Sequence, residues 1–357
     1  MTIQSTALLL FWATLAGLGL GWHANARTLA QTSAASAMDV ETFSFPAGKS
    51  AVQVPFELLA NAVFVSAKVN GKGPFLFAID TGSWGSVFAS ELADELGMKP
   101  LGETQGTGAG GTYKMGVVRG KIAFELPGGL QLSTEDANTV SMAGLWPLIG
   151  QRIYGDIGYD VLKDLVVGFD YENKLVTFYA PANYNYSGKG EALRATLEMN
   201  YDPQVAGTFA VEGMAAVSTR FTIDTGAGGT VINAPLVKAN DLLKTVTDKI
   251  PSPSHGVGGG ESNDVVGRVE SITLGPYKLR QPLVALSRDT TGSLTMEDIG
   301  INVGGNILRR FTVIIDYPRR RVILEPNSHF ADPFLADASG LVLKAEGSDF
   351  KTVVGMG

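Results

Sequence analysis

The chain has 357 residues and a formal net charge of −7. Hydrophobic residues make up 45% of it, which is enough apolar material for the core of one large domain or of two lobes. The lack of cysteine excludes thiol catalysis, disulfides and thiolate metal sites, and three histidines without an HExxH motif argue against a histidine metal site. The sequence contains no basic patch with interleaved aromatic residues, so we do not expect nucleic acid as a partner. Carboxylates therefore remain as the catalytic candidates, and the 44 glycines favour a mainly β protein.

Residues 1–26 are predicted to be a secretory signal peptide. An apolar run from Ala7 to Trp22 precedes the small-residue cleavage pattern of residues 24–26, and residues 35–37 repeat that pattern. No Lys or Arg precedes the run, so a membrane anchor is the alternative, although a span needs about 20 apolar residues. We expect a periplasmic or secreted protein, with anchoring by this segment as the alternative.

Three blocks of sequence occur twice, in the same order and at nearly the same spacing. The clearest pair is AIDTGSWGSVF and TIDTGAGGTVI. The three pairs begin at Ala78 and Thr222, at Thr104 and Ser254, and at Ile157 and Val303. Recurrence of this kind indicates a duplicated domain. We expect an N-terminal lobe over residues 38–180, a polar linker over residues 181–192 and a C-terminal lobe over residues 193–327.

Each copy is predicted to contain the same series of elements. An apolar strand ends at the DTG sequence, and a short helix follows, from Ser90 in the first copy and from Ala234 in the second. Strands with period-two patterning come next, and then a turn or short helix and two further strands. The fold class predicted is therefore all-β, mainly β with short helices.

Asp80 and Asp224 are the candidate catalytic residues. Each ends an apolar strand and is followed by Thr, which can hydrogen-bond locally, and by Gly, which permits close backbone approach. If the two loops meet across a pseudo-twofold axis, the carboxylates face each other and hold one proton between them. The ionised member can take a proton from water and the protonated member can polarise a carbonyl. This is amide hydrolysis without a metal or any other cofactor.

The sequence resembles the aspartic proteases, more closely the bacterial retropepsin-like family with two fused lobes, over about residues 55–326. The DTG loops carry the resemblance, and DIG at Asp156 and NVG at Asn302 match the family's hydrophobic-hydrophobic-Gly motif loosely. The resemblance implies a bilobal aspartic protease fold of two β-barrel-like lobes, a peptide or protein substrate between them, and Asp80 and Asp224 as the catalytic dyad. The supporting residues that it implies in the catalytic loops are Thr81, Gly82, Ser83, Thr225, Gly226 and Ala227, with the two threonines gripping each other across the lobes.

The two loops also differ. Ser83 is in a position to hydrogen-bond the outer oxygen of Asp80, whereas Ala227 has no such group for Asp224, so we expect unequal surroundings for the two carboxyls. Trp84 stands where the second copy has Gly228, and either lines a pocket or packs.

The two glycine-rich blocks are candidate flaps, because mobile hairpins over a site favour glycine. The alternative is a plain glycine hairpin. The first block formally matches GxGxxG, but a strand-like segment follows it, which argues against a dinucleotide site. The candidate flap residues are Gly106, Gly108, Gly110, Gly111 and Tyr113 in the first copy and Gly256, Gly258, Gly259 and Gly260 in the second.

Residues 338–357 are predicted to form two strands, over residues 341–345 and 350–354. In the family that the chain resembles, a PDZ-like domain often follows the second lobe, so this segment is either a truncated PDZ-like segment or a terminal hairpin packed on lobe two.

The function predicted is an exported aspartic endopeptidase, monomeric because both aspartates lie in one chain. The alternatives are a non-catalytic peptide-binding protein on the same fold and a dimer that needs two chains.

Overall fold

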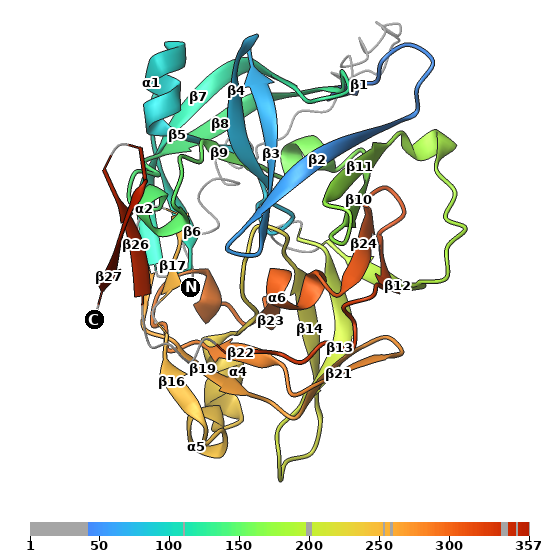
Figure 1. Cartoon of the computed structure of the whole chain (residues 1–357), viewed down its shortest axis with the longest axis vertical. Coiled ribbons are helices and arrows are strands. Elements are labelled where there is room, and N and C mark those ends of the chain that lie inside the picture. The colour runs from blue at the N-terminus through green and yellow to red at the C-terminus, as the bar shows by residue number, and fades with distance from the viewer. Residues whose placement is uncertain are drawn as a thin grey trace, which may run out of the picture. The chain divides into compact units, whose positions relative to one another are not determined.

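The structure, a computed structural model, describes residues 42–109, 111–197, 202–252, 254–257, 260–336, 342–347 and 349–356. The predicted signal peptide and the flap residues Gly110, Gly258 and Gly259 lie outside the described residues. Strands predominate in these ranges and the helices are short, as predicted (Figure 1). Within the same ranges, no helix combines the length and the apolar character that crossing a membrane would require.

The first lobe is formed by the first nine strands and three short helices. Its strands are β1 (Phe43–Ser44), β2 (Ala51–Leu59), β3 (Ala62–Val69), β4 (Lys72–Ile79), β5 (Val87–Ala89), β6 (Gly102–Gly108), β7 (Gly111–Glu125), β8 (Gln131–Val140) and β9 (Gly155–Ile157). Its helices are α1 (Ser90–Leu96), α2 (Trp146–Ile149) and α3 (Tyr159–Leu162). Helix α1 begins at the predicted residue and ends at Gly97, whose φ of 72° is favourable for glycine and stops the helix.

The second lobe repeats this series. Its strands are β13 (Gln204–Ala210), β14 (Val217–Ile223), β15 (Val231–Ile232), β16 (Lys249–Pro251), β17 (Ser254–His255), β18 (Glu261–Ser262), β19 (Val265–Arg268), β20 (Ser271–Leu274), β21 (Tyr277–Arg280), β22 (Leu283–Leu286) and β23 (Ile301–Val303). Its helices are α4 (Ala234–Ala239), α5 (Leu242–Thr245) and α6 (Gly305–Leu308). Helix α4 begins where the sequence predicted it, after Asn233, whose side chain accepts a hydrogen bond from the Leu236 N–H.

A parallel strand pair lies behind each DTG sequence. In the first lobe β4 pairs with β9, so that Ile79 stands opposite Ile157. In the second lobe β14 pairs with β23, so that Ile223 stands opposite Val303. All four side chains are fully buried. Both DTG loops therefore leave a strand that is fixed by an apolar neighbour at its last residue.

A six-stranded antiparallel sheet joins the lobes, in the order β2, β11, β10, β24, β25, β12. Its remaining strands are β10 (Val166–Asp170), β11 (Leu175–Tyr179), β12 (Glu191–Thr196), β24 (Phe311–Asp316) and β25 (Arg321–Pro326). Strands β10 and β24 come from equivalent positions of the two copies, and their pairing is centred on Gly168 opposite Ile314. The duplication is therefore expressed as a strand pair whose register has pseudo-twofold symmetry, and Figure 1 shows β10 and β24 next to each other.

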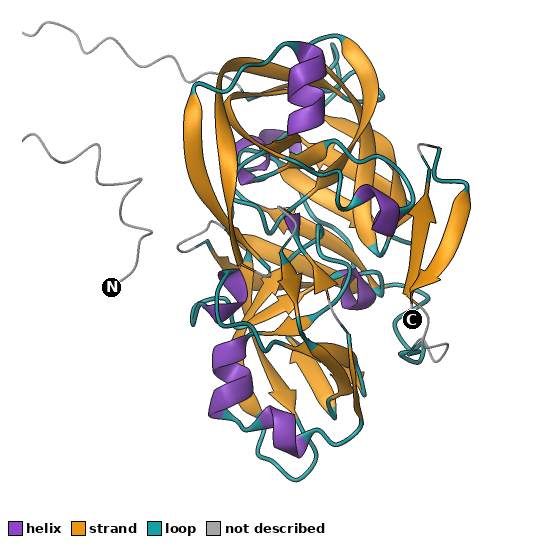
Figure 2. Cartoon of the chain, turned by 90° about the vertical axis from the view of Figure 1, so that its left-hand side faces the viewer, coloured by secondary structure: helices purple, strands orange, loops and turns teal. Residues whose placement is uncertain are grey.

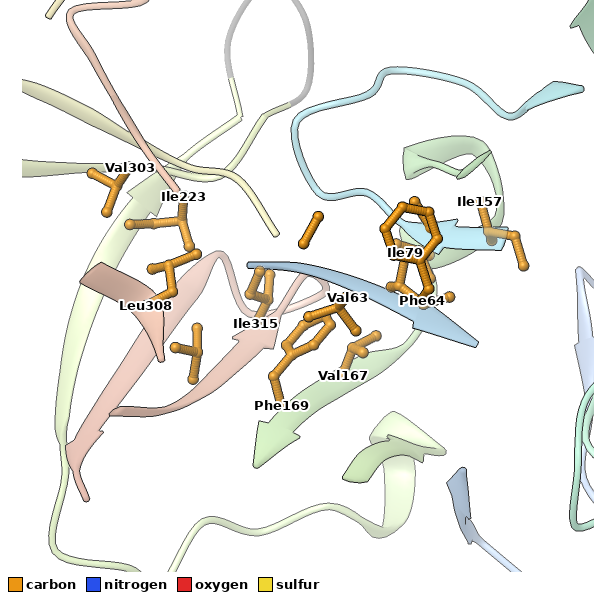
Figure 3. Packing of buried hydrophobic residues seen from close by; sticks show 14 of the residues in the cluster. Val63, Phe64, Ile79, Ile157, Val167, Phe169, Ile223, Val303, Leu308 and Ile315 are labelled. Atoms are coloured by element: carbon orange, nitrogen blue, oxygen red, sulfur yellow. The ribbon is translucent and has the colours of Figure 1, made fainter. Parts of the chain in front are cut away.

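The core is continuous from one lobe to the other. Figure 3 shows Val167, Phe169 and Ile315 of the joining sheet between Ile79 and Ile157 on one side and Ile223 and Val303 on the other. The opposite face of the sheet carries a smaller cluster around Ile314, covered by tyrosines of the segment after β11. Burial of this apolar surface fixes the two DTG loops relative to each other.

Asp170 and Asp316 close the turns after β10 and β24. Asp170 accepts a hydrogen bond from the Asn173 N–H, and Asp316 accepts one from the Arg319 N–H. Asp316 is fully buried and also pairs with the guanidinium groups of Arg319 and Arg321. Neither aspartate forms a second dyad.

The predicted terminal hairpin is present, with strands β26 (Val342–Glu346) and β27 (Thr352–Met356). Strand β26 lies against helix α2, and Figure 2 shows the hairpin near the C-terminus at the edge of the molecule. Its partner therefore belongs to the first lobe, and the expectation that the hairpin would pack on lobe two is wrong. The truncated PDZ-like origin of this segment stays a prediction.

Candidate active site

The backbone of each DTG loop is attached to the parallel strand behind it. The N–H of Asp80 donates to the carbonyl of Ile157 at 3.1 Å, and the N–H of Asp224 donates to the carbonyl of Val303 at 3.0 Å. The strand-end position of both aspartates thus follows from the apolar sequences that precede them. Ile157 and Val303 occupy equivalent positions in the two copies, so the two aspartates have equivalent backbone partners.

Thr81 and Thr225 interlock the two loops. The Thr81 hydroxyl donates to the carbonyl of Ile223 at 2.6 Å, and the Thr225 hydroxyl donates to the carbonyl of Ile79 at 2.5 Å. In the reverse direction, the N–H of each threonine donates to the other threonine's hydroxyl, at 3.3 Å for Thr81 and 3.1 Å for Thr225. Both threonines are buried, so these bonds hold the loops in one arrangement.

Gly82 and Gly226 allow the two aspartates to come together. A Cβ at Gly82 would lie 2.6 Å from the carboxyl carbon of Asp224, and a Cβ at Gly226 would overlap the carboxyl of Asp80. Each carboxyl therefore rests on the glycine of the other loop. Asp80 and Asp224 are also hydrogen-bonded to each other through their side chains. The sequence-predicted pair is thus brought into contact.

The two carboxyls have different hydrogen-bond partners. Asp80 accepts from the Gly82 N–H at 2.8 Å. Asp224 accepts from the N–H groups of Gly226 and Ala227, both at 2.9 Å, and from the side-chain amide of Asn302 at 2.7 Å. Asp224 is therefore the better stabilised as an anion.

Ser83 does not have the role that the sequence suggested. Its hydroxyl donates to the carbonyl of Gly85 at 2.8 Å and also lies against Asp156. The expectation that Ser83 would bond the outer oxygen of Asp80 is therefore wrong. The asymmetry of the two loops is present, but the side chains of Asn302 and Asp156 and the N–H of Ala227 cause it, and the Ser83 hydroxyl does not.

Burial and neighbouring charges raise the pKa of both dyad carboxyls. For Asp80, burial and then the charges of Asp224 and Asp156 hold the pKa well above its usual range, while the Gly82 N–H opposes them. For Asp224, burial raises the pKa and the hydrogen bond from Asn302 is the largest opposing contribution. Such a pair retains a proton at a pH where two isolated carboxyls would both be ionised.

Two further buried carboxyls lie near the dyad. Asp156 is 5% exposed, its Oδ1 has no hydrogen-bond partner, and burial together with Asp160 raises its pKa to about 8. Asp202 is also 5% exposed, its Oδ1 is likewise unpaired, and burial together with Asp224 raises its pKa to about 8. Sequence reasoning missed Asp202, because nothing in its local pattern signals proximity to the dyad.

The first candidate flap is the hairpin of β6 and β7. Gly106 stands opposite Tyr113 in this hairpin, and a Cβ at Gly106 would lie 2.7 Å from the Tyr113 ring. Burial, followed by the charges of Asp156 and Asp80, raises the pKa of Tyr113 to about 12. Tyr113 is therefore close enough to the dyad to sense its charge.

The second candidate flap is the hairpin of β17 and β18, and its described part meets the first. A Cβ at Gly256 would lie 2.5 Å from the carbonyl oxygen of Ala109, at the tip of the first flap. Gly108 and Gly111 lie beside Gly292, in the turn before the 3₁₀ helix Ser293–Thr295, and the Gly260 carbonyl accepts from the Gly256 N–H. Both glycine-rich blocks thus lie at one contact between the lobes.

Trp84 and Gly228 differ for a steric reason. A Cβ at Gly228 would overlap the carbonyl of Ala60, which comes from the turn between β2 and β3 of the other lobe. Trp84 has no such restriction and is 57% exposed. The position in the second copy is therefore limited to glycine by the neighbouring lobe, whereas the first copy presents an aromatic ring to solvent.

Metal ligation is not indicated at the dyad. Across the part of the chain that the structure describes, no group of three or more His, Cys, Asp or Glu side chains has an arrangement suited to a metal ion. His255, which stands beside the second glycine-rich block, is exposed.

Comparison with known proteins assigns the chain to one family. The sequence matches the aspartyl protease family over residues 65–161 and 208–301, which together make up more than half of the chain and include both DTG loops. The chain belongs to this family. Among solved structures, the aspartic proteinase from Irpex lacteus is similar with a TM-score of 0.49 and 14% identity, covering 79% of this chain and 99% of that one. A comparison with curated proteins finds no match.

Proposed function

We propose that the protein is an exported aspartic endopeptidase that hydrolyses peptide bonds with a water molecule activated between Asp80 and Asp224. One observation carries the proposal: two carboxyls from two copies of a repeat are held in contact by the interlocked threonines Thr81 and Thr225. An arrangement that concentrates buried negative charge is costly, so a chain that builds it from both halves has a chemical use for it.

The reaction begins with one proton shared by the two carboxyls. The ionised carboxyl takes a proton from the bound water, and the water oxygen forms a bond to the carbon of the peptide carbonyl. The protonated carboxyl gives its proton to the carbonyl oxygen, which yields a neutral tetrahedral diol. A proton then passes from the dyad to the amide nitrogen, and a hydroxyl of the diol gives its proton to the ionised carboxyl. The C–N bond breaks, a carboxylic acid and an amine are released, and the dyad again holds one proton. Each proton is accounted for within the dyad and the water.

The rest of the site positions this chemistry. The Thr81 and Thr225 bonds fix the separation of the carboxyls. The two glycine-rich hairpins meet each other, and we propose that they act as flaps over a bound peptide. Both halves come from one chain, so we propose that the active form is a monomer.

Replacement of each aspartate tests the proposal. Asp80→Asn and Asp224→Asn keep the shape of the side chain but remove the shared proton, and each should abolish cleavage of a fluorogenic peptide library. Asp170→Asn is the matched control, because Asp170 closes a turn and lies outside the site. Undiminished cleavage in either dyad variant would refute the assignment. Binding of peptides without turnover by the unaltered protein would instead favour a peptide-binding protein.

Export is a separate part of the proposal and rests on the apolar run and the small-residue pattern of residues 24–26. The N-terminus of the protein recovered from the secreting cell should begin after residue 26 or after residue 37. A mature protein that retains Met1 and sediments with membranes would support the anchor instead.

A further inference from the structure

Asp156 and Asn302 occupy equivalent positions in the two copies. Asp156 stands opposite Ala78 in the pair of β4 and β9, and Asn302 stands opposite Thr222 in the pair of β14 and β23. The next residue of each strand is buried in the core. Because side chains alternate along a strand, residues 156 and 302 both lie on the face away from the core, toward the dyad.

The side chains at these two positions are chemically opposite. Asn302 carries an amide that donates to the Asp224 carboxyl at 2.7 Å. Asp156 carries a carboxyl that contributes to the negative surroundings of Asp80, and its Oδ1 has no partner although the residue is 95% buried. An amide donor stabilises a neighbouring carboxylate, whereas a carboxyl at the equivalent position offers no N–H group and repels the carboxylate when it is itself ionised.

We infer that Asn302 and Asp156 are positioning residues that give the dyad a fixed charge polarity, in which Asp224 carries the negative charge and Asp80 carries the proton. The backbone contributes in the same direction, because Asp224 accepts two N–H bonds from its own loop and Asp80 accepts one. The side-chain bond between the two aspartates then runs from the Asp80 hydroxyl to the Asp224 carboxylate.

Among the residues that the structure describes, the further ionisable groups linked electrostatically to the dyad or to Asp156 are acids. Besides the dyad itself, the groups whose charges act on it or on Asp156 are Asp160 and Asp202, together with the phenols of Tyr113, Tyr171 and Tyr317. The three tyrosines remain neutral because burial raises their pKa values. Asp156 and Asp202 are each linked by charge to both dyad carboxyls, and of the two Asp156 has the larger effect on Asp80.

The polarity assigns the two catalytic roles, and this step rests on the proposed function. Asp224 takes the proton from the water, and Asp80 gives its proton to the carbonyl oxygen. The acid limb of the pH profile then reports protonation of Asp224, and the alkaline limb reports ionisation of Asp80.

The charge distribution is tested without any activity, by ¹³C NMR of the carboxyl carbons in protein labelled at aspartate and assigned through the backbone amides. At the pH where the dyad holds one proton, the Asp224 carbon should show the shift of a carboxylate and the Asp80 carbon that of a carboxylic acid. In the exchanged variant Asp156→Asn with Asn302→Asp, the two shifts should change places. A charge on Asp80 in the unaltered protein, or no exchange in the folded variant, would overturn the inference.

Single variants provide a second readout if the exchanged variant fails to fold. Asn302→Ala removes a hydrogen bond to the charged carboxyl and should move the acid limb of kcat/KM to higher pH by about one unit. Asp156 ionises near pH 8 and then repels ionised Asp80, so Asp156→Asn removes this repulsion and should move the alkaline limb to lower pH. Equal movement of both limbs in each variant would contradict the assigned polarity. Lack of cleavage by the unaltered protein would contradict the proposed function and leave the NMR result decisive for the polarity.

Discussion

Two buried aspartates of the second copy should respond to the same substitution in opposite ways. Asp202 precedes β13 and has an unpaired Oδ1, whereas Asp316 closes the turn after β24 and pairs with Arg319 and Arg321. Both are at least nine-tenths buried. Asn has the same shape as Asp but carries no charge, so Asp→Asn removes only the ionisation and its interactions.

The effect at Asp202 depends on pH. Burial raises the pKa of Asp202 from 3.8 to about 8, so the folded protein binds this proton more tightly than the unfolded chain does. The stability contributed by the proton is complete below pH 4 and is lost as the pH rises to 8. At pH 7, which is roughly three units above the pKa of 3.8 in the unfolded chain, the unfolded chain has released this proton and the folded protein still holds it. This lowers the free energy of unfolding by about 4 kcal/mol relative to low pH. Because the amide of Asn also lacks a partner there, we expect Asp202→Asn to stabilise the fold by about 2–3 kcal/mol at pH 7.

The measurement is urea unfolding of each variant at pH 4 and pH 7. Asp202→Asn should raise the free energy of unfolding at pH 7 and lower it by about 1–2 kcal/mol at pH 4, where Asp202 is protonated in the folded protein and only the unpaired amide counts. Asp316→Asn should lower it by about 3–5 kcal/mol at pH 7, because it leaves two guanidinium groups without their buried carboxylate. Equal effects of Asp202→Asn at the two pH values, or a loss of stability at pH 7, would refute the reasoning.

Two further variants examine the loops themselves. Thr225→Val leaves the carbonyl of Ile79 without its donor at the buried contact between the lobes and should lower the free energy of unfolding by about 2–4 kcal/mol; a loss under 1 kcal/mol in urea unfolding would contradict this role. Gly226→Ala places a methyl group where the Asp80 carboxyl lies and should reduce kcat by about 100-fold. Gly229→Ala in the same loop, where a Cβ meets nothing within 4 Å, is its control and should retain activity.

The sequence was sufficient to predict the elements and the dyad because both depend on local pattern and on the repeat. The apolar strands before Asp80 and Asp224 and the helices that begin at Ser90 and Ala234 each follow from a short stretch of residues. The duplication supplied the pairing of the two loops, since a single DTG sequence carries no information about a distant partner.

The contacts that distinguish the two halves could not be predicted in the same way. Asn302 was visible only as part of a loose motif, and its bond to Asp224 depends on the register of β14 and β23. The restriction at Gly228 comes from a turn of the other lobe, and Asp202 lies near the dyad only after β13 is placed. Each of these depends on strand pairing between remote segments, which the period of the side chains does not determine.

The pairing of β10 with β24 at Gly168 and Ile314 makes the chain the equivalent of a dimer whose subunits are tied together. A half expressed alone would end in a bare sheet edge that is complementary to itself, and would form such pairs with any other copy it met. The covalent connection through residues 181–190 makes this pairing intramolecular. Each half therefore pairs with the other half of its own chain, at an effective concentration set by the linker. Fusion of the halves thus frees assembly from protein concentration, and it also frees the two sequences to diverge, as Asp156 and Asn302 have done.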